Sequence, residues 1–128
     1  MNWHTVLASR EGLEGHGTST GLVIRKDARF VALPSVKALW RTVAIRFRGE
    51  LYIVPVLDVG PWNENDDRYV FNYDFPLAAH GIGKYTKPTN SAGIDLSDGL
   101  TVVLLGKDEE WGLRVVEWSL LGPNDLRL

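Results

Sequence analysis

The sequence predicts a mainly β protein, a small barrel built from short strands. Three observations support this class. Runs rich in β-branched and aromatic residues are short, several of them alternate between apolar and polar residues, and Gly- and Pro-rich turns separate them. With 128 residues, of which 45% are hydrophobic and 23% charged, the chain has the composition of a globular protein. We expect a single domain over residues 1–128, long enough to bury a core without cross-links.

The first third of the chain predicts short strands around a glycine-rich loop. Thr5–Ala8 can form a first strand, and residues 11–21 carry four glycines, which is typical of a loop. Leu22–Ile24 is a brief β-prone run, and Phe30–Leu33 is another, ended by Pro34.

A β-hairpin is the clearest local prediction. Thr42–Phe47 alternates apolar and polar residues, Arg48 and Gly49 form a tight turn, and residues 50–57 continue as an apolar, β-branched strand. Pro55 cannot donate a hydrogen bond to a neighbouring strand, so we expect an edge or a bulge there.

The segment 63–92 is long for a connection in a small domain, and long ordered loops are often functional. Its aromatic residues recur at every second position, which predicts a strand with one apolar face; they are Tyr69, Phe71, Tyr73 and Phe75. Pro76–His80 can form one helical turn before Gly81.

The last part of the chain predicts a helix and a strand. Ser97 can cap a helix that runs to Leu105, with Gly106 beyond its end, although Gly99 and the β-branched residues leave a strand as the alternative. Leu113–Leu121 alternates and predicts a final strand.

Several functional classes are disfavoured by composition. The net charge is −2 with no basic face, which argues against a nucleic-acid partner, and the absence of cysteine excludes thiolate chemistry. The three histidines lack metal-ligand spacing, and neither a phosphate loop nor a serine-hydrolase elbow occurs. We expect no metal and no cofactor. No apolar run is long enough to span a membrane, and the N-terminal residues lack the pattern of a signal peptide.

Two aspartates stand where apolar strands end. Asp58 follows an apolar run and precedes the turn pair Gly60–Pro61, and Asp95 lies between Ile94 and Leu96. A carboxylate among apolar neighbours has its charged form disfavoured, so its pKa rises, and such a group can act as a general acid. The alternative for each is that it only accepts bonds from nearby backbone N–H groups.

These residues belong to a set of motifs that resembles a known family. Thr18–Gly21, Phe30–Pro34, Val56–Pro61 and Ile94–Ser97 follow one another as in the double-psi β-barrel domain of rare lipoprotein A. That domain is related to expansins, to a family of endoglucanases and to the membrane-bound lytic transglycosylase A group. The resemblance covers residues 15–121.

The resemblance implies a six-stranded double-psi β-barrel with one or two short helices, a long insert loop over residues 63–92, and a groove for a polysaccharide. The functionally important Asp of the Asp-Gly-Pro motif matches Asp58, and the catalytic acid of the transglycosylase and endoglucanase branches matches Asp95. The expansin threonine matches Thr18 or Thr20. We expect Asp95 to be the general acid/base and Asp58 to stabilise charge or orient the sugar, and the reverse assignment stays open.

The sequence departs from the family at two positions. Leu22 stands where the rare lipoprotein A enzymes have a Glu, and Leu33 stands where they have a His. The insert is also longer than in close relatives, and its His80 is a candidate for a replacement group. Trp62, Tyr69 and Tyr73 are candidates for stacking on sugar rings.

Three functions follow from these observations. The first is a peptidoglycan lytic transglycosylase or glycosidase that uses Asp58 and Asp95. The second is an expansin-like module that binds a cell-wall glycan without cutting it, which the missing Glu and His favour. The third is a structural barrel of a larger, phage-derived or wall-penetrating assembly. The resemblance implies the cell envelope, whereas the lack of a signal-peptide pattern fits synthesis in the cytoplasm. We expect peptidoglycan or another polysaccharide as the partner, with no membrane insertion.

Overall fold

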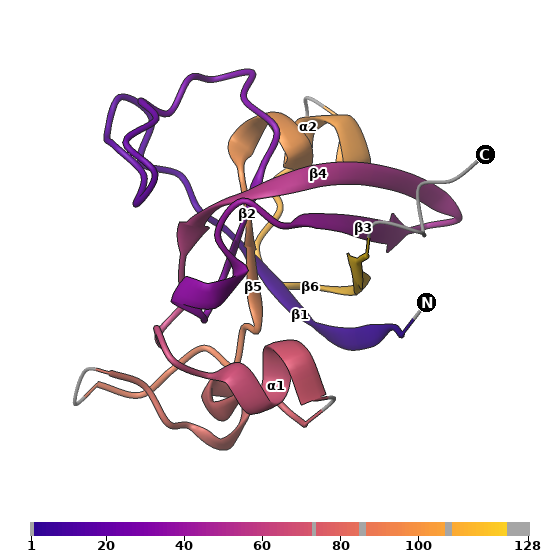
Figure 1. Cartoon of the computed structure of the whole chain (residues 1–128). Coiled ribbons are helices and arrows are strands. Elements are labelled where there is room, and N and C mark those ends of the chain that lie inside the picture. The colour runs from indigo at the N-terminus through magenta and orange to yellow at the C-terminus, as the bar shows by residue number, and fades with distance from the viewer. Residues whose placement is uncertain (1, 73, 85–86, 107–108, 123–128) are drawn as a thin grey trace.

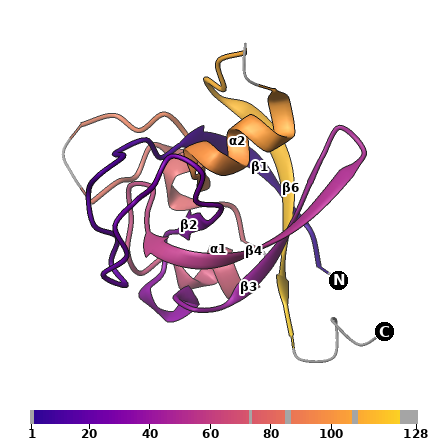
Figure 2. The same ribbon diagram turned by 90° about the horizontal axis from the view of Figure 1, so that it is seen from above.

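The computed structural model describes residues 2–72, 74–84, 87–106 and 109–122. Six strands close into a barrel in the spatial order β1-β5-β2-β4-β3-β6 (Figures 1 and 2). This confirms the predicted mainly β fold with short helices and a long insert. The strands are β1 (His4–Arg10), β2 (Val31–Leu33), β3 (Thr42–Phe47), β4 (Glu50–Val59), β5 (Ile94–Leu96) and β6 (Arg114–Leu121).

The predicted hairpin is present as β3 and β4. Arg48 and Gly49 have φ values of 51° and 80°, as a two-residue turn between twisted antiparallel strands requires. Pro55 pairs with Thr42 of β3, while the pairing of β4 with β2 begins only at Val56. Pro55 therefore lies at an edge on the β2 side, where its missing N–H costs no ladder bond.

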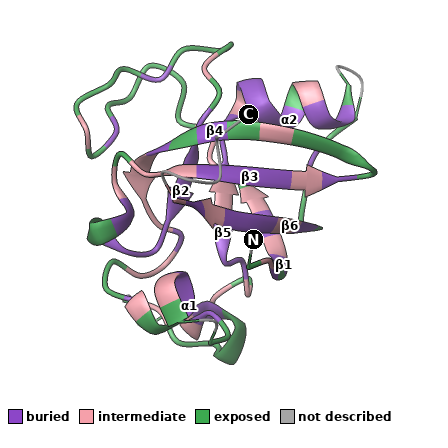
Figure 3. Ribbon diagram, turned by 45° about the vertical axis from the view of Figure 1, so that its right-hand side comes forward, coloured by how far each residue is buried: buried purple, intermediate pink, exposed green. Residues whose placement is uncertain are grey.

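Two strand pairs are parallel, β1 with β5 and β2 with β4. A simple meander contains only antiparallel neighbours, so these pairs distinguish the barrel from one. Alternate residues of the strands fill the interior, as Val43, Ile45 and Phe47 do on β3. Buried residues accordingly concentrate on the strands, whereas the long loops are largely exposed (Figure 3).

The predicted C-terminal helix is confirmed as α2 (Asp98–Leu105). The side chain of Ser97 accepts a hydrogen bond from the backbone of Leu100, so it caps the helix as expected. Gly99 lies against the chain at Asp27–Ala28: a Cβ on this glycine would be 2.4 Å from the Ala28 carbonyl oxygen. The glycine that weakened the helix prediction is thus needed for packing.

The insert contains helices rather than the predicted aromatic strand. The region becomes α1 (Asp67–Asn72), and the expected turn near Pro76 becomes the 3₁₀ helix η2 (Leu77–His80). Tyr69 and Val70 are adjacent and both buried, which a half-exposed strand cannot achieve but a helix packed on the barrel end can. α1 lies at one end of the barrel and α2 at the other (Figure 1).

The β-prone run at residues 22–24 is not a strand. An isolated bridge between Gly17 and Val23 and a few backbone hydrogen bonds join it to the preceding loop. Leu22 and Val23 are exposed, so no sheet neighbour covers them, and Ile24 alone is buried. None of the described helices is long and apolar enough to cross a membrane.

Candidate functional site

One row of residues crosses four neighbouring strands on the outside of the barrel. Ala32 of β2 pairs with Asp58 of β4 on one side and with Asp95 of β5 on the other. Asp95 also pairs with Ser9 of β1. Residues paired in this way point to the same face of a sheet. The neighbouring Val31 belongs to the core, so the row faces outward.

The two predicted aspartates are thus brought together, with one strand between them. Neighbouring strands are about 4.8 Å apart, which places the Cα atoms of Asp58 and Asp95 roughly 10 Å apart. The chain after Asp58 approaches Asp95: a Cβ on Gly60 would lie 3.7 Å from Oδ2 of Asp95. The backbone N–H of Gly60 also donates to the Leu33 carbonyl at 3.1 Å. Gly60 therefore forms a wall beside Asp95.

Asp58 is held in its charged form. Its Oδ1 accepts hydrogen bonds from the backbone N–H of Ser19 (2.9 Å), the hydroxyl of Ser19 (2.8 Å) and the N–H of Val59 (2.9 Å). Burial by itself would raise the pKa of Asp58, but the hydrogen bonds from Glu11, Ser19 and Val59 hold the pKa below its usual value. The glycine-rich loop is thereby fastened to the end of β4.

Glu11 is a third carboxyl group at the site, beside Asp58 and Asp95, although the sequence did not identify it as a site residue. Its backbone N–H donates to the Leu96 carbonyl at 2.8 Å, just beyond the end of β1. Burial, the hydrogen bond to Asp58 and the charges of Asp58, Asp95 and Asp98 raise the pKa of Glu11 to about 10. Its Oε2 is buried and has no partner among the described residues, which a neutral carboxyl tolerates far better than a charged one.

Asp95 is a half-buried carboxyl that titrates close to neutral pH. Burial raises its pKa to about 6; the hydrogen bond from the Ser9 hydroxyl opposes this shift, and the charge of Asp58 adds to it. A group with such a pKa can both release and accept a proton near neutral pH. The site therefore combines three acids: Asp58 is charged, Glu11 is neutral, and Asp95 has a pKa between those of the other two.

Thr18 and Thr20 lie beside Asp58, where they hold the loop. The Thr20 hydroxyl donates to the Leu57 carbonyl at 2.9 Å, and the hydroxyls of Thr18 and Thr20 are 2.8 Å apart. Thr18 also accepts a bond from the Leu22 N–H at 3.2 Å. Both hydroxyls thus have partners within the protein and position Ser19 against Asp58.

Trp62 follows the Asp58 turn and is half-buried. It lines a cavity of about 80 Å³ together with Val59, Gly60, Asn63, Glu64 and Lys84. Its indole N–H donates to Oδ1 of Asn90 at 2.7 Å, which fixes the orientation of the ring. Trp62 is accordingly placed next to the row of carboxyl groups.

Other predicted residues lie elsewhere. Tyr69 is fully buried, with its hydroxyl donating to the Gly93 carbonyl at 2.8 Å and accepting from the Trp118 indole at 2.7 Å. It is a core residue rather than the predicted stacking residue, because no ligand can reach its ring. His80 is exposed and lines a separate cavity of about 280 Å³ within the insert. Tyr73 lies outside the described residues.

The residues that the sequence did not reveal are Ser9, Glu11 and Ser19. The first strand extends to Arg10, beyond the predicted end at Ala8, and so places Ser9 in the row. Ser9, Arg10 and Glu11 are three consecutive polar residues, so no alternation of apolar and polar residues pointed to Ser9 or Glu11. Leu33 faces the core, and Ala32 is the β2 residue in the row. Among the described residues, no group of three or more acidic or histidine side chains could hold a metal ion.

A family described as "Domain of unknown function (DUF8814)" matches residues 2–75, more than half of the chain. No curated protein matches. Among solved structures, the Streptomyces papain inhibitor (SPI) is similar, with a TM-score of 0.57 and 16% identity over 94% of this chain and 96% of the inhibitor.

Expansin from Clavibacter michiganensis is also similar. A mutant of it in complex with cellohexaose gives a TM-score of 0.56 and 14% identity over 94% of this chain and 51% of the expansin. The apo form gives a TM-score of 0.56 and 13% identity over 95% and 52%. This chain therefore spans about half the length of the expansin. At such identities the similarity shows the fold alone, and the fold it shows is the predicted expansin-like barrel. The narrower resemblance to rare lipoprotein A stays a prediction.

Proposed function

We propose that this chain, which belongs to the family described as "Domain of unknown function (DUF8814)", binds a polysaccharide across its outward row of carboxyl groups without cutting it. The observation that carries the proposal is the alignment of Ser9, Asp95, Ala32 and Asp58 on one face, with Trp62 beside them. Carboxyl and hydroxyl groups can bond sugar hydroxyls, and an indole ring suits the apolar face of a sugar.

The row runs across four neighbouring strands, and this direction favours an extended ligand lying across the strands. Ala32 is fully buried, so contacts with the ligand would come from its neighbours Asp58 and Asp95. The expansin of the same fold was solved with cellohexaose, which supports a linear glycan as the ligand class. The papain inhibitor shares the fold as well, so the proposal rests on the residues of the site and not on the fold.

Binding without cleavage fits the chemistry of Glu11 and Asp58. Asp58 is occupied by bonds from Ser19, Val59 and Glu11, so its charge is already compensated by the protein. A nucleophile or base that is so fully bonded is a weak one. Peptidoglycan, cellulose and chitin are all candidate ligands, and peptidoglycan is the one that the resemblance to rare lipoprotein A implies.

The test is sedimentation of the protein with insoluble cellulose, chitin and purified peptidoglycan. We expect the wild type to pellet with at least one of them and Trp62→Ala to lose about threefold to tenfold in affinity, the value of one aromatic contact. Trp3→Ala is the matched control, since Trp3 is half-buried like Trp62 but precedes the start of β1, whereas the site lies at its end. No pelleting with any of the three materials contradicts the proposal.

A second function is favoured by one observation, the pKa of about 6 at Asp95. In a lytic transglycosylase one carboxyl can protonate the leaving oxygen and then accept the proton of the attacking sugar hydroxyl, so Asp95 alone would suffice. Mass spectrometry of a peptidoglycan digest distinguishes this function from binding. Anhydro-sugar ends that vanish in Asp95→Asn would establish cleavage, and their absence alongside pelleting would leave the binding function.

A further inference from the structure

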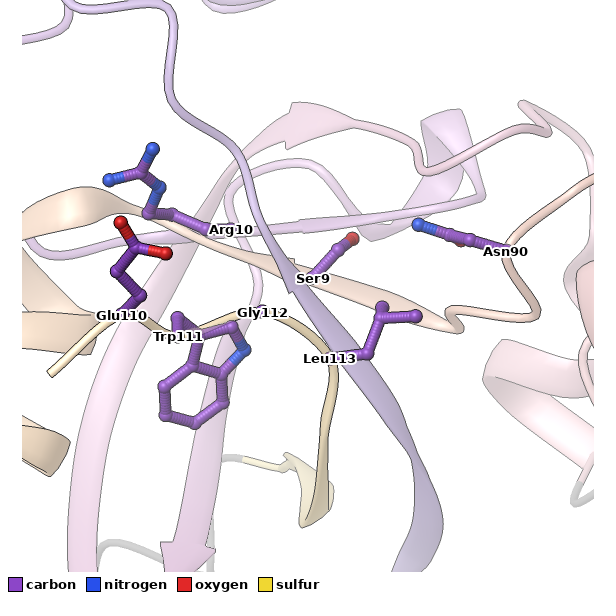
Figure 4. Close-up of a pocket in the computed structure, with 7 residues that line it drawn as sticks. All are labelled: Ser9, Arg10, Asn90, Glu110, Trp111, Gly112 and Leu113. Carbon is purple, nitrogen blue, oxygen red and sulfur yellow. The ribbon is translucent and has the colours of Figure 1, made fainter.

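A second cavity lies next to Asp95, on the side away from the Asp58 turn. Its volume is about 350 Å³, within the range of small-ligand sites. Figure 4 shows Arg10 and Glu110 on one side, Asn90 on the other, and Ser9 and Leu113 between them. Neither the family nor the proposed function so far assigns this cavity a role.

Two residues connect the cavity to the row of carboxyl groups. Ser9 lines the cavity, and its hydroxyl donates a hydrogen bond to Oδ1 of Asp95. Asn90 also lines it, and its Oδ1 accepts the indole N–H of Trp62. Asp95 therefore lies between the cavity and the smaller one at Gly60 and Trp62.

The walls of the cavity are fixed by the fold. The indole N–H of Trp111 donates to the Ala8 carbonyl of β1 at 2.9 Å, and Arg114 donates to the Trp111 carbonyl at 3.0 Å. These bonds hold the turn at residues 110–113 against β1. A ligand would thus enter a preformed space and would not have to order a loop.

The lining suits a neutral sugar ring. Arg10 supplies donors, Glu110 supplies acceptors and the Asn90 amide supplies donors, so hydroxyls around a ring find partners of both kinds. Leu113 offers an apolar surface for a ring face. Arg10 forms an ion pair with Asp98, with Nε 3.6 Å from Oδ1, so its charge is compensated on that side. The carboxylate of Glu110 in the lining therefore disfavours an anionic sugar.

We propose that this cavity is a second sugar subsite of the same binding surface, so that a neutral glycan places one ring at Trp62 and another in the cavity, with Asp95 beside the linkage region between them. The inference rests on the proposed function and gives it a ligand class, a neutral linear glycan long enough to occupy both places. Its consequence is an affinity that increases with chain length until both subsites are filled.

The test is calorimetric titration with two ladders of soluble oligosaccharides, cellobiose to cellohexaose and the corresponding oligomers of N-acetylglucosamine. We expect wild-type affinity to increase about tenfold from the short to the long members of one ladder, the gain from one or two further hydrogen bonds. Leu113→Trp places a larger side chain in the lining and so reduces the space in the cavity. Leu113 is 45% exposed and outside the core, so the larger side chain does not have to disrupt core packing. This variant should bind short oligomers like wild type and lose the gain with length.

Val115→Trp is the matched control, because Val115 is exposed two residues further along the chain, in β6, and does not line the cavity. It should keep the full dependence on length. A Leu113→Trp variant that also keeps this dependence would overturn the subsite while leaving glycan binding intact. A wild type that binds no oligomer and no insoluble glycan would instead overturn the proposed function, and the subsite with it.

Discussion

The carboxyl group of Glu11 donates a hydrogen bond to the carboxylate of Asp58, so the two acids hold one proton between them. This bond joins the segment after β1 to the end of β4, and Ser19 joins the glycine-rich loop to the same aspartate. One buried proton therefore contributes to the position of two segments at the candidate site. Because the proton is held by a pair, its release is a property of both groups.

Replacing Glu11 by Gln should remove a pH dependence of stability. The pKa of Glu11 is raised from 4.5 to about 10, so the stability that it contributes is fully present below the unfolded value and is lost as pH rises through the folded one. Gln stays neutral and can still donate to Asp58. Urea unfolding from about pH 5 to about pH 9 should show a falling free energy of unfolding for wild type and a flatter profile for Glu11→Gln. Glu14→Gln, at an exposed position of the same loop, serves as control, and an unchanged slope in Glu11→Gln would refute the shared proton.

Removing the hydroxyl of Ser9 should raise the pKa of Asp95 above about 6. Burial and the charge of Asp58 raise this pKa, and the hydrogen bond from Ser9 lowers it. Ser9→Ala removes the hydrogen bond and keeps the two effects that raise the pKa. Carboxyl ¹³C chemical shifts measured during a pH titration report the value directly. Ser91→Ala, at a half-buried serine outside the row, should leave it unchanged. A pKa that falls in Ser9→Ala would contradict the assignment of Ser9 as a donor to the charged form.

Adding one methyl group at Gly99 should destabilise the protein by about 1–3 kcal/mol, the usual cost of overpacking. The new Cβ would lie 2.4 Å from the Ala28 carbonyl oxygen and 2.6 Å from backbone atoms of Asp27, so the chain there or α2 must move. Chemical denaturation measures the loss. Val102→Ala, on the exposed side of the same helix, should cost less than Gly99→Ala. Both changes increase helix propensity, so a Gly99→Ala variant that loses no more stability than Val102→Ala would refute the close packing.

The hydroxyl of Tyr69 should contribute to the attachment of the insert to the barrel. Tyr69→Phe leaves the Gly93 carbonyl and the Trp118 indole N–H buried without this partner, at a cost of about 1–3 kcal/mol. The measurement is the change in the denaturation midpoint at constant slope. Among the described residues the Tyr52 hydroxyl bonds only Glu50, at the surface, so Tyr52→Phe should have little effect. If the two variants lose equal stability, the buried network is not what holds α1.

Local features of the sequence were enough for several elements. The alternation of Thr42–Phe47 and the Arg48–Gly49 turn specified the hairpin, and Ser97 with Gly106 specified the limits of α2, because these signals act between residues close in the chain. The aromatic spacing around Tyr69 was misleading. Its period of two fits a strand, but the residue is needed at the barrel end, where its ring and hydroxyl meet Trp118, and tertiary packing decided in favour of a helix.

For the site, the sequence by itself singled out Asp58 and Asp95 and predicted that a small β-barrel would carry them. Asp58 lies next to the end of β4 as expected, whereas Asp95 is the middle residue of β5. Only the tertiary structure decided which groups meet them. The closed barrel inserts β2 between β4 and β5, so Ala32 separates the two aspartates, and it brings the end of β1 alongside β5, so Ser9 reaches Asp95 and Glu11 reaches Asp58. These contacts join residues far apart in the chain. Strand order and burial determine these contacts, and the contacts determine the protonation state of each acid. Neither the contacts nor the protonation states can be predicted from a local sequence pattern.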